Sequence, residues 1–181
     1  LVNLLEEEFQ IDLKIISGGN SANYEWFKSS QNIGRINNLR VGESILLGCE
    51  TLGRKAIPGL HRNAFQLVAE VIESKRKASV PLGEICQDAF GNVPAFLDRG
   101  DHQRVIVALG RQDIQASNLK PNNKLTMIGS SSDHIILDGE NYNLKVGDEI
   151  RFNLDYSGLL ATMTSPFVIK QFTDSNAHVA V

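Results

Sequence analysis

The chain has 181 residues, enough for one domain or for one domain and part of another. Hydrophobic residues make up 42%, so a core can form. The formal net charge of -3 argues against a nucleic-acid or anionic-membrane surface, which needs an excess of Lys and Arg. Two cysteines, Cys49 and Cys86, are too few for a disulfide framework or a Cys-rich metal site. No apolar run approaches the roughly 20 residues of a membrane span, so a cytoplasmic enzyme or module is the first expectation.

The N-terminal part of the chain alternates between helical and strand-like patterns. Apolar residues at helical spacing predict a helix over 2–9, and DLKIIS predicts a short strand over 12–17. After the polar loop GGNSAN, YEWFKS predicts a helix over 24–29, and a second short strand is expected over 34–39. A strand, a polar glycine loop and a helix follow one another in this way in parallel sheets and barrels.

Beyond residue 60 the pattern becomes one of strands separated by Gly, Asn and Asp turns. A spacing of roughly 8–12 residues between turns is typical of a sandwich or barrel. Residues 156–164 could form a helix or an irregular edge. The predicted strand segments are AFQLVAEVIES (64–74), VPLGEI (80–85), QRVIVALG (103–110), KLTMIGSSSDHIILD (124–138), DEIRFNL (148–154) and FVIKQF (167–172).

The expected fold class is therefore mainly β (α+β overall), in two parts. Two βα units are too few for an independent parallel sheet, so residues 1–55 resemble the C-terminal end of a (β/α)8 barrel, or TIM barrel. Such a remnant is expected to pack on the β domain or to exchange with a partner chain. Residues 56–173 form the expected β-rich domain, and 174–181 a flexible tail.

The loop GGNSAN has the composition of a phosphate site. Gly18 and Gly19 end the first strand without a Cβ atom, and Asn20 or Ser21 can cap the following helix. Such a loop aims backbone N–H groups and a hydroxyl at one point, as phosphate sites do. The alternative is a plain helix cap in a tight loop, which is common.

A second candidate loop is NNLRVGES, in which Arg40 precedes Gly42 and Glu43. The N–H groups of Gly42 and Glu43 could donate to a phosphate with Arg40 beside them, although a surface ion pair of Arg40 is the simpler interpretation. Consecutive βα loops of a barrel end side by side, so Ser21 and Gly42 could grip one phosphate.

Together these loops resemble the phosphate-binding segments of fold-type III pyridoxal-phosphate-dependent amino-acid racemases. The resemblance covers residues 1–172 and implies the C-terminal part of an enzyme of the alanine/ornithine racemase family. It also implies an amino-acid substrate and a head-to-tail homodimer, in which each active site lies between one subunit's barrel and the other's β domain. Further segments occur in the family's order: AFQLVAEVIE, VPLGEICQDAFG, VALGRQDI, SSSDHIILD, VGDEIRFNLDY and LLATMTSPFV.

The resemblance assigns cofactor contacts residue by residue. Ser21 matches the serine that binds the phosphate of pyridoxal 5'-phosphate, with Asn20 beside it. Gly42 and Glu43 match the positions whose backbone amides bind the same phosphate. Tyr156, in NLDYSGLL, resembles a C-terminal tyrosine that donates to it.

Arg40 matches the arginine that faces the pyridine nitrogen of the cofactor. A guanidinium cannot lose its proton in a protein, so it donates to this nitrogen and keeps it unprotonated. A neutral pyridine is a weaker electron sink, which disfavours transamination relative to proton return to the opposite face. Decarboxylases of the same fold usually place a carboxylate at this position, so Arg40 favours a racemase.

The family's catalytic groups are only partly matched. No residue corresponds to the Schiff-base lysine, because Lys14, Lys28 and Lys55 lie outside its position, so this chain alone is expected to be inactive. A family tyrosine acts as the base on the opposite face of the substrate, but residues 81–91 contain no tyrosine.

Asp88 and Glu84 are the candidate second bases in this stretch, with Cys86 a weaker one, and each could instead be a turn or surface residue. An acidic loop would suit a cationic substrate side chain such as that of ornithine. Arg111 and Asp113, in GRQDI, could contact the substrate carboxylate or each other.

The expected function is interconversion of L- and D-amino acids, of the ornithine or alanine type, by two-base proton transfer at Cα of the amino acid bound to pyridoxal phosphate. The alternatives are a non-catalytic β-barrel interaction or regulatory module, or part of a related pyridoxal-phosphate decarboxylase. The four histidines have no metal-binding spacing, so no metal is expected. Among them, His61 and His102 are expected to be exposed and in loops.

Overall fold

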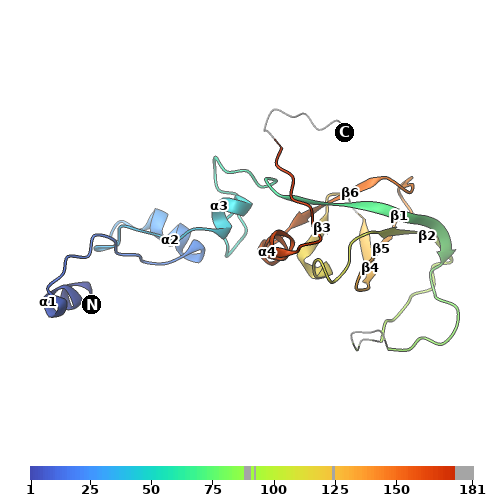
Figure 1. The fold of residues 1–181 in the computed structure, drawn as a ribbon, viewed down its shortest axis with the longest axis horizontal. Helices are drawn as coiled ribbons and strands as arrows, with labels where there is room; N and C mark the ends of the chain where they lie inside the picture. The colour runs from blue at the N-terminus through green and yellow to red at the C-terminus, as the bar shows by residue number, and fades with distance from the viewer. Residues whose placement is uncertain (88–90, 92, 124, 174–181) are drawn as a thin grey trace. The chain divides into compact units, whose positions relative to one another are not determined.

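The computed structural model describes residues 1–87, 91, 93–123 and 125–173 and divides the chain into two compact units, Leu1–Phe65 and Gln66–Val181 (Figure 1). The division lies later in the chain than the boundary expected at residue 55. Residues beyond 49 turn back onto the first unit, because Cys49 and Ala56 form an antiparallel bridge and the Ile57 N–H donates to the Gly48 carbonyl at 3.0 Å.

The first unit contains short helices joined by loops: α1 (Val2–Phe9), the 3-10 turn η1 (Ser21–Asn23), α2 (Tyr24–Ser29) and α3 (Glu43–Leu47). The helices predicted over 2–9 and 24–29 are confirmed.

The two strands predicted over 12–17 and 34–39 are wrong as strands, since only one parallel bridge forms there, between Ser17 and Asn38. The Asn37 side chain, and not a second strand, binds the backbone of the first segment. Its Oδ1 accepts from the Ile16 N–H at 2.9 Å, and its Nδ2 donates to the Lys14 carbonyl at 2.8 Å.

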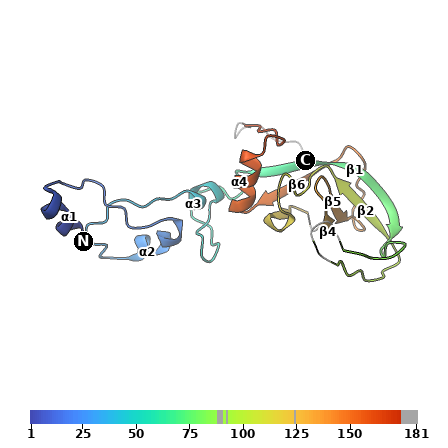
Figure 2. The same cartoon turned by 60° about the horizontal axis from the view of Figure 1, so that its bottom comes forward.

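The second unit is built on a curled antiparallel sheet of six strands in the order β3-β6-β1-β2-β5-β4 (Figures 1 and 2). A short 3-10 turn, η2 (Ala116–Asn118), precedes β3, and α4 (Tyr156–Thr164) follows β6. The strands are β1 (Gln66–Ala78), β2 (Asp101–Val107), β3 (Leu119–Pro121), β4 (Thr126–Ser130), β5 (Ile135–Asp138) and β6 (Glu149–Leu154).

The long strand β1 holds the two halves of this sheet together. Its residues 66–70 pair with β6, and from Val71 onward it pairs with β2. A register shift between Val71 and Glu73 marks the change of partner, as expected where a bulge bends a strand. The unit is therefore mainly β, as predicted.

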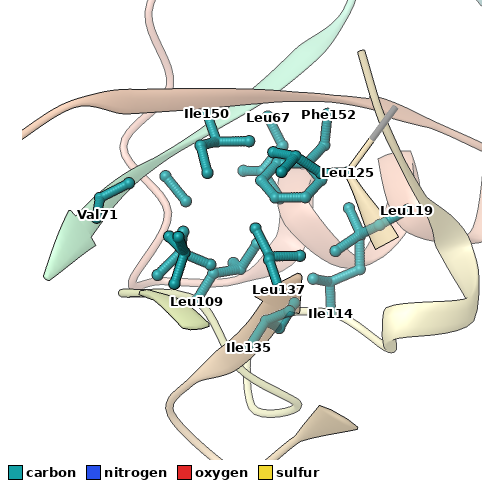
Figure 3. Packing of buried hydrophobic residues seen from close by; sticks show 13 residues of the cluster. Leu67, Val71, Leu109, Ile114, Leu119, Leu125, Ile135, Leu137, Ile150 and Phe152 are labelled. Carbon is teal, nitrogen blue, oxygen red and sulfur yellow. The ribbon is translucent and has the colours of Figure 1, made fainter. Parts of the chain in front are cut away.

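The inward-facing side chains of both halves form one apolar core (Figure 3). Alternation along β1 buries Leu67, Ala69 and Val71 and leaves Val68 41% exposed. The cluster consists of Leu67, Ala69, Val71, Val105, Val107, Leu109, Ile114, Leu119, Leu125, Ile135, Leu137, Ile150 and Phe152.

Two other predicted strands are wrong. Residues 80–85 and 167–172 form no strand, although their composition suits one. Residues 81–87 are exposed and gain no packing against a sheet. In the second segment Phe167 (71%) and Ile169 (82%) are exposed, and although Val168 packs against the core, the segment pairs with no strand of the described structure.

Residues 156–164, left open between helix and irregular edge, form α4. Asp155 caps this helix by accepting a hydrogen bond from the Gly158 N–H at 2.7 Å. The expected flexible tail, 174–181, lies outside the described residues.

Candidate functional site

The two candidate loops of the first unit lie side by side, as the sequence predicts. The Gly18 N–H donates to the Asn38 carbonyl at 3.0 Å, and the Arg40 N–H donates to the Gly19 carbonyl at 3.1 Å. The close approach requires glycine, since a Cβ at position 18 would lie 2.4 Å from Ile36 Cδ1.

The two loops meet at the Ser21 hydroxyl. Ser21 is buried, and its Oγ accepts from the N–H groups of Gly42 at 3.2 Å and Ser44 at 3.4 Å. We call Ser21, Gly42, Glu43 and Ser44 the cradle. An ideal Cβ at Gly42 would meet no atom within 4 Å, so there is open space at this position.

Ser44 is a member of this site that sequence reasoning did not single out. Its side chain is 1% exposed, and its Oγ has no hydrogen-bond partner among the described residues. A buried hydroxyl without a partner is costly in the absence of a ligand or water. Its position directly after Glu43 in NNLRVGES was the only sequence signal that could have pointed to it.

Asn20 caps the turn that follows the first loop, as the simpler interpretation of GGNSAN expects. Its Oδ1 accepts from the Ala22 N–H at 2.9 Å, and its own N–H donates to Asn23 Oδ1 at 3.1 Å. The cap orients the loop so that the neighbouring Ser21 points inward, which gives Asn20 an observed structural role beside any contact with a ligand.

Arg40 and Glu43 have different surroundings. The Arg40 guanidinium forms no hydrogen bond or ion pair with any residue in the described parts of the chain, so the ion pair considered for it is not seen. The Glu43 carboxylate forms an ion pair with Arg54. Arg40 is thus available as a donor, whereas Glu43 is engaged through its side chain.

The other candidate residues belong to the second unit. Arg111 Nε donates to Ser130 Oγ at 2.9 Å, and Asp113 Oδ2 accepts from the Gly110 N–H at 3.3 Å. Tyr156 is 39% exposed at the start of α4. Arg111 lines a cavity of about 710 Å³ whose walls include the isoleucines of four strands, Ile72, Ile106, Ile128 and Ile136.

The proposed second bases lie in the long segment between β1 and β2. Glu84 is exposed, and so is Cys86. Asp88 lies outside the described residues. The roles of these residues stay predictions.

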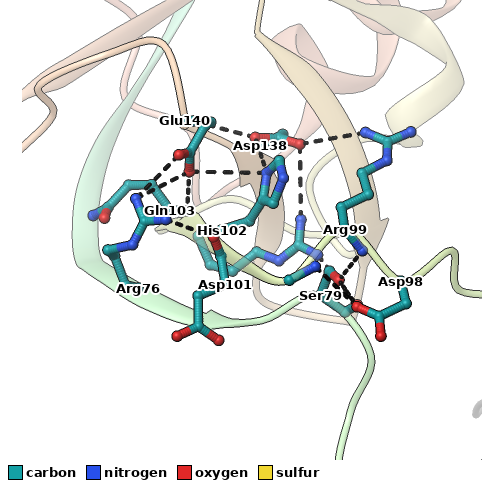
Figure 4. A network of polar contacts seen from close by, with 11 residues as sticks. Arg76, Ser79, Asp98, Arg99, Asp101, His102, Gln103, Asp138 and Glu140 are labelled. Carbon is teal, nitrogen blue, oxygen red and sulfur yellow. Dashed lines mark hydrogen bonds and ion pairs between the residues drawn. The ribbon is translucent and has the colours of Figure 1, made fainter.

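A polar network near the β1–β2 end of the sheet is centred on Asp138 (Figure 4). Burial opposes its ionisation, but the Glu140 N–H and then the nearby His102 and Arg104 outweigh this, so the pKa of Asp138 lies below its ordinary value. His102 Nδ1 lies 3.5 Å from Asp138 Oδ1. His102 was expected to be exposed in a loop, but it lies in β2 with its side chain 18% exposed, because strand β2 begins at Asp101.

The described residues offer neither a metal site nor a membrane span. They contain no group of three or more His, Cys, Asp or Glu side chains that could hold a metal ion. They also contain no helix of the length and apolarity that crossing a membrane requires.

Comparison with known proteins identifies relatives of this chain. Over 170 residues the chain is 44% identical to an ornithine racemase of Acetoanaerobium sticklandii. The aligned region covers 92% of this chain and 48% of that relative. The chain is also 43% identical over 173 residues to a lysine racemase of Thermotoga maritima, spanning 94% of this chain and 49% of the relative. The chain is homologous to these amino-acid racemases. No family model matches it.

The racemase homologue spans about half the length of the curated relatives it matches, corresponding to their C-terminal half. Its fold resembles that of an alanine racemase from Bartonella henselae whose structure contains covalently bound pyridoxal phosphate. The TM-score is 0.52 at 20% identity, over 82% of this chain and 40% of that one. The mainly β second unit thus has the fold of the C-terminal domain of alanine racemase.

Proposed function

We propose that this racemase homologue supplies the phosphate-binding side of a pyridoxal-phosphate site and the β domain of an amino-acid racemase. The observation that carries the proposal is the cradle, where the N–H groups of Gly42 and Ser44 converge on the Ser21 hydroxyl at the junction of two loops. Convergent N–H donors beside a hydroxyl suit a phosphate group.

The residues present fit the cofactor's phosphate. Ser44 contributes a buried hydroxyl without a partner among the described residues, and the space at Gly42 is open. The Ser21 hydroxyl and the backbone N–H groups of Gly42 and Glu43 would hold the phosphate, with Asn20 beside them, once the Gly42 N–H exchanges its bond to Ser21 Oγ for one to the phosphate. Tyr156 is proposed as a further donor on the resemblance of its surrounding sequence.

Arg40 is assigned to the ring nitrogen, where its guanidinium donates and cannot lose its proton. The absence of a partner for this side chain in the described residues supports the assignment. Pyridoxal phosphate, when bound, supplies an electron sink for the negative charge that develops at Cα. Arg40 keeps that sink weak, which favours return of the proton over transamination.

The first unit is proposed to be the end of a (β/α)8 barrel covering residues 1–55. The parallel bridge between Ser17 and Asn38 and the alternation of loops and helices support this. Apolar side chains exposed along the unit, such as Phe9 (64%) and Ile15 (71%), suit packing against further barrel elements. A head-to-tail homodimer, with the β domain facing a partner's barrel, is proposed from the same resemblance, and a cytoplasmic setting is proposed from the composition of the chain.

The proposed substrate is an amino acid with a cationic side chain. The relatives named above are an ornithine and a lysine racemase, and Glu84 supplies an exposed carboxylate in the loop where alanine racemases carry a tyrosine. Asp88 or Glu84 would hold or move the proton on one face of Cα, and Arg111 and Asp113 would contact the substrate. The Schiff-base lysine lies outside the matched positions, so the 181-residue chain alone is proposed to be inactive.

Incubation of the full-length racemase with L-ornithine, L-lysine or L-alanine in deuterium oxide tests this function. We expect deuterium at Cα with loss of optical rotation, fastest for ornithine or lysine. Release of carbon dioxide would instead identify a decarboxylase, and fastest turnover of alanine would overturn the substrate proposal. A Glu84→Ala/Asp88→Ala variant that racemises ornithine at the normal rate would overturn the assignment of the second base.

A further inference from the structure

Glu43 presents an electrostatic problem for the proposed phosphate site. Within the cradle it lies between Gly42 and Ser44, whose N–H groups donate to the Ser21 hydroxyl. A carboxylate here has the same sign of charge as a phosphate and is itself an acceptor for nearby N–H groups. Without a counter-charge, Glu43 would weaken the binding of any anion at the cradle.

Arg54 supplies that counter-charge. Its guanidinium forms an ion pair with the Glu43 carboxylate, and the two side chains are 50% and 20% exposed, respectively. The pair joins the loop at residues 50–55 to the first residue of α3, although eleven positions separate the two residues in sequence.

The loop that carries Arg54 is organised around a second carboxylate. Glu50 is 5% exposed, and its carboxylate accepts from the N–H groups of Leu52 at 2.8 Å, Gly53 at 2.9 Å and Lys55 at 2.7 Å. The Lys55 N–H, followed by that of Gly53, lowers the pKa of Glu50 below its ordinary value, so the carboxylate stays charged at neutral pH.

This organisation fixes the conformation of Arg54. Its φ of 57° lies in the left-handed region, which non-glycine residues rarely adopt unless their surroundings hold them there. Because the N–H groups on both sides of Arg54, those of Gly53 and Lys55, bind the Glu50 carboxylate, the loop presents its side chain in a defined position.

We infer that Arg54 is a positioning residue for the cradle: it pairs with Glu43, cancels its charge and holds its carboxylate, so that the cradle accepts a phosphate group. The inference rests on the proposed function. An ordinary exposed ion pair contributes little to stability and nothing to ligand binding, whereas the proposed role of Arg54 is an effect on anion affinity. Loss of Arg54 should therefore change anion affinity more than folding.

Binding of inorganic phosphate, pyridoxal phosphate and pyridoxal to the 181-residue chain tests the inference. The Arg54→Met variant should bind both phosphate-containing probes about three- to tenfold more weakly at low salt, and less so at high salt. Pyridoxal, which has no phosphate, should show no such change. Arg54→Lys should stay within about twofold of the wild type because it keeps the charge.

Rescue distinguishes this role from a merely structural one. Adding Glu43→Gln to Arg54→Met should restore the affinity, and Glu43→Gln alone should tighten phosphate binding, because Arg54 then acts unopposed. Arg35→Met is the matched control, since Arg35 also pairs with a glutamate of the first unit, Glu6. It should leave the phosphate affinity of the folded chain unchanged, although loss of this pair lowers the stability of the first unit.

Each outcome is decisive. Equal affinity of wild type and Arg54→Met, or failure of Glu43→Gln to rescue it, overturns the inference while leaving the phosphate site in place. If Arg54→Met does not fold, as judged by circular dichroism, unchanged or weaker phosphate binding by Glu43→Gln alone overturns it. If the wild type binds pyridoxal phosphate no better than pyridoxal, the proposed phosphate site fails and this inference fails with it.

Discussion

Ser21 is the residue on which the two loops of the first unit converge. A hydroxyl can accept two N–H groups and still donate its own proton, so it can serve both the protein and a bound anion. Its burial distinguishes it from the exposed polar residues around it.

Ser21→Ala should therefore weaken binding of pyridoxal phosphate to the chain by on the order of tenfold, the scale of one hydrogen bond to a charged group. Fluorescence titration measures this effect. Ser17→Ala is the control, because Ser17 is exposed just before the GGNSAN loop and its hydroxyl forms no hydrogen bond with the cradle among the described residues. Equal loss of affinity in both variants would contradict a specific contact by Ser21.

At the residue scale, the sequence predicts that two consecutive loops contribute residues to one site. It does not predict which residue a more distant loop adds to that site. Ser21 and Gly42 could be placed together because consecutive βα loops end side by side. Arg54 could not be placed against Glu43, because the turn at residues 50–55 depends on a carboxylate binding its own backbone. Ser44 was missed because a buried hydroxyl has no pattern in sequence.

At the element scale, α1 is tied to the rest of the first unit by Glu6. Its carboxylate accepts from both terminal nitrogens of Arg35 and from the Leu13 N–H at 2.9 Å. Chiefly through the bond from Arg35, the pKa of Glu6 falls from its ordinary 4.5 to about 2. The charged form is therefore favoured in the folded state.

This stabilisation is fully present above about pH 4.5 and is lost as the pH falls toward 2, since protonation then removes the acceptor. Glu6→Gln should destabilise the first unit at neutral pH and flatten its pH dependence between these values. Chemical denaturation at a series of pH values measures both effects. Glu8→Gln, on the same helix, should leave the profile unchanged, and an unaltered profile in Glu6→Gln would refute the account.

Strand prediction succeeded where alternation matched a pairing partner and failed where composition alone suggested a strand. Residues 66–72 alternate between exposed and buried positions, and the strand pairs with β6 and then with β2, so β1 forms. Residues 167–172 are equally apolar but pair with no strand in the described structure. Strand propensity reflects packing against neighbours, which a single sequence does not display.

At the scale of the whole molecule, the two units differ in how much apolar surface they bury. The second unit has a core of 13 residues, whereas the buried hydrophobic residues of the first are Cys49 and Ile57 among those that the structure describes. Resistance to local opening follows buried apolar contacts.

Amide hydrogen exchange of the 181-residue chain should therefore be slowest in β1, β2 and β6 and at least tenfold faster in residues 2–40, a difference of about 1.4 kcal/mol in opening free energy. Mass spectrometry of peptides from exchanged protein measures it. Addition of pyridoxal phosphate should slow exchange around residues 18–24 and 40–46. Equal protection of both units in the free chain would contradict this description.

The shared strand β1 has a consequence for how the second unit breaks. Residues 66–70 belong to one half of the sheet and residues from Val71 onward to the other. Neither half can therefore unfold without removing a paired strand from the other half. A pulling force on either half is thus carried into the other half along the backbone of β1. The unit should yield as a single mechanical element, with no stable half-opened form along the way.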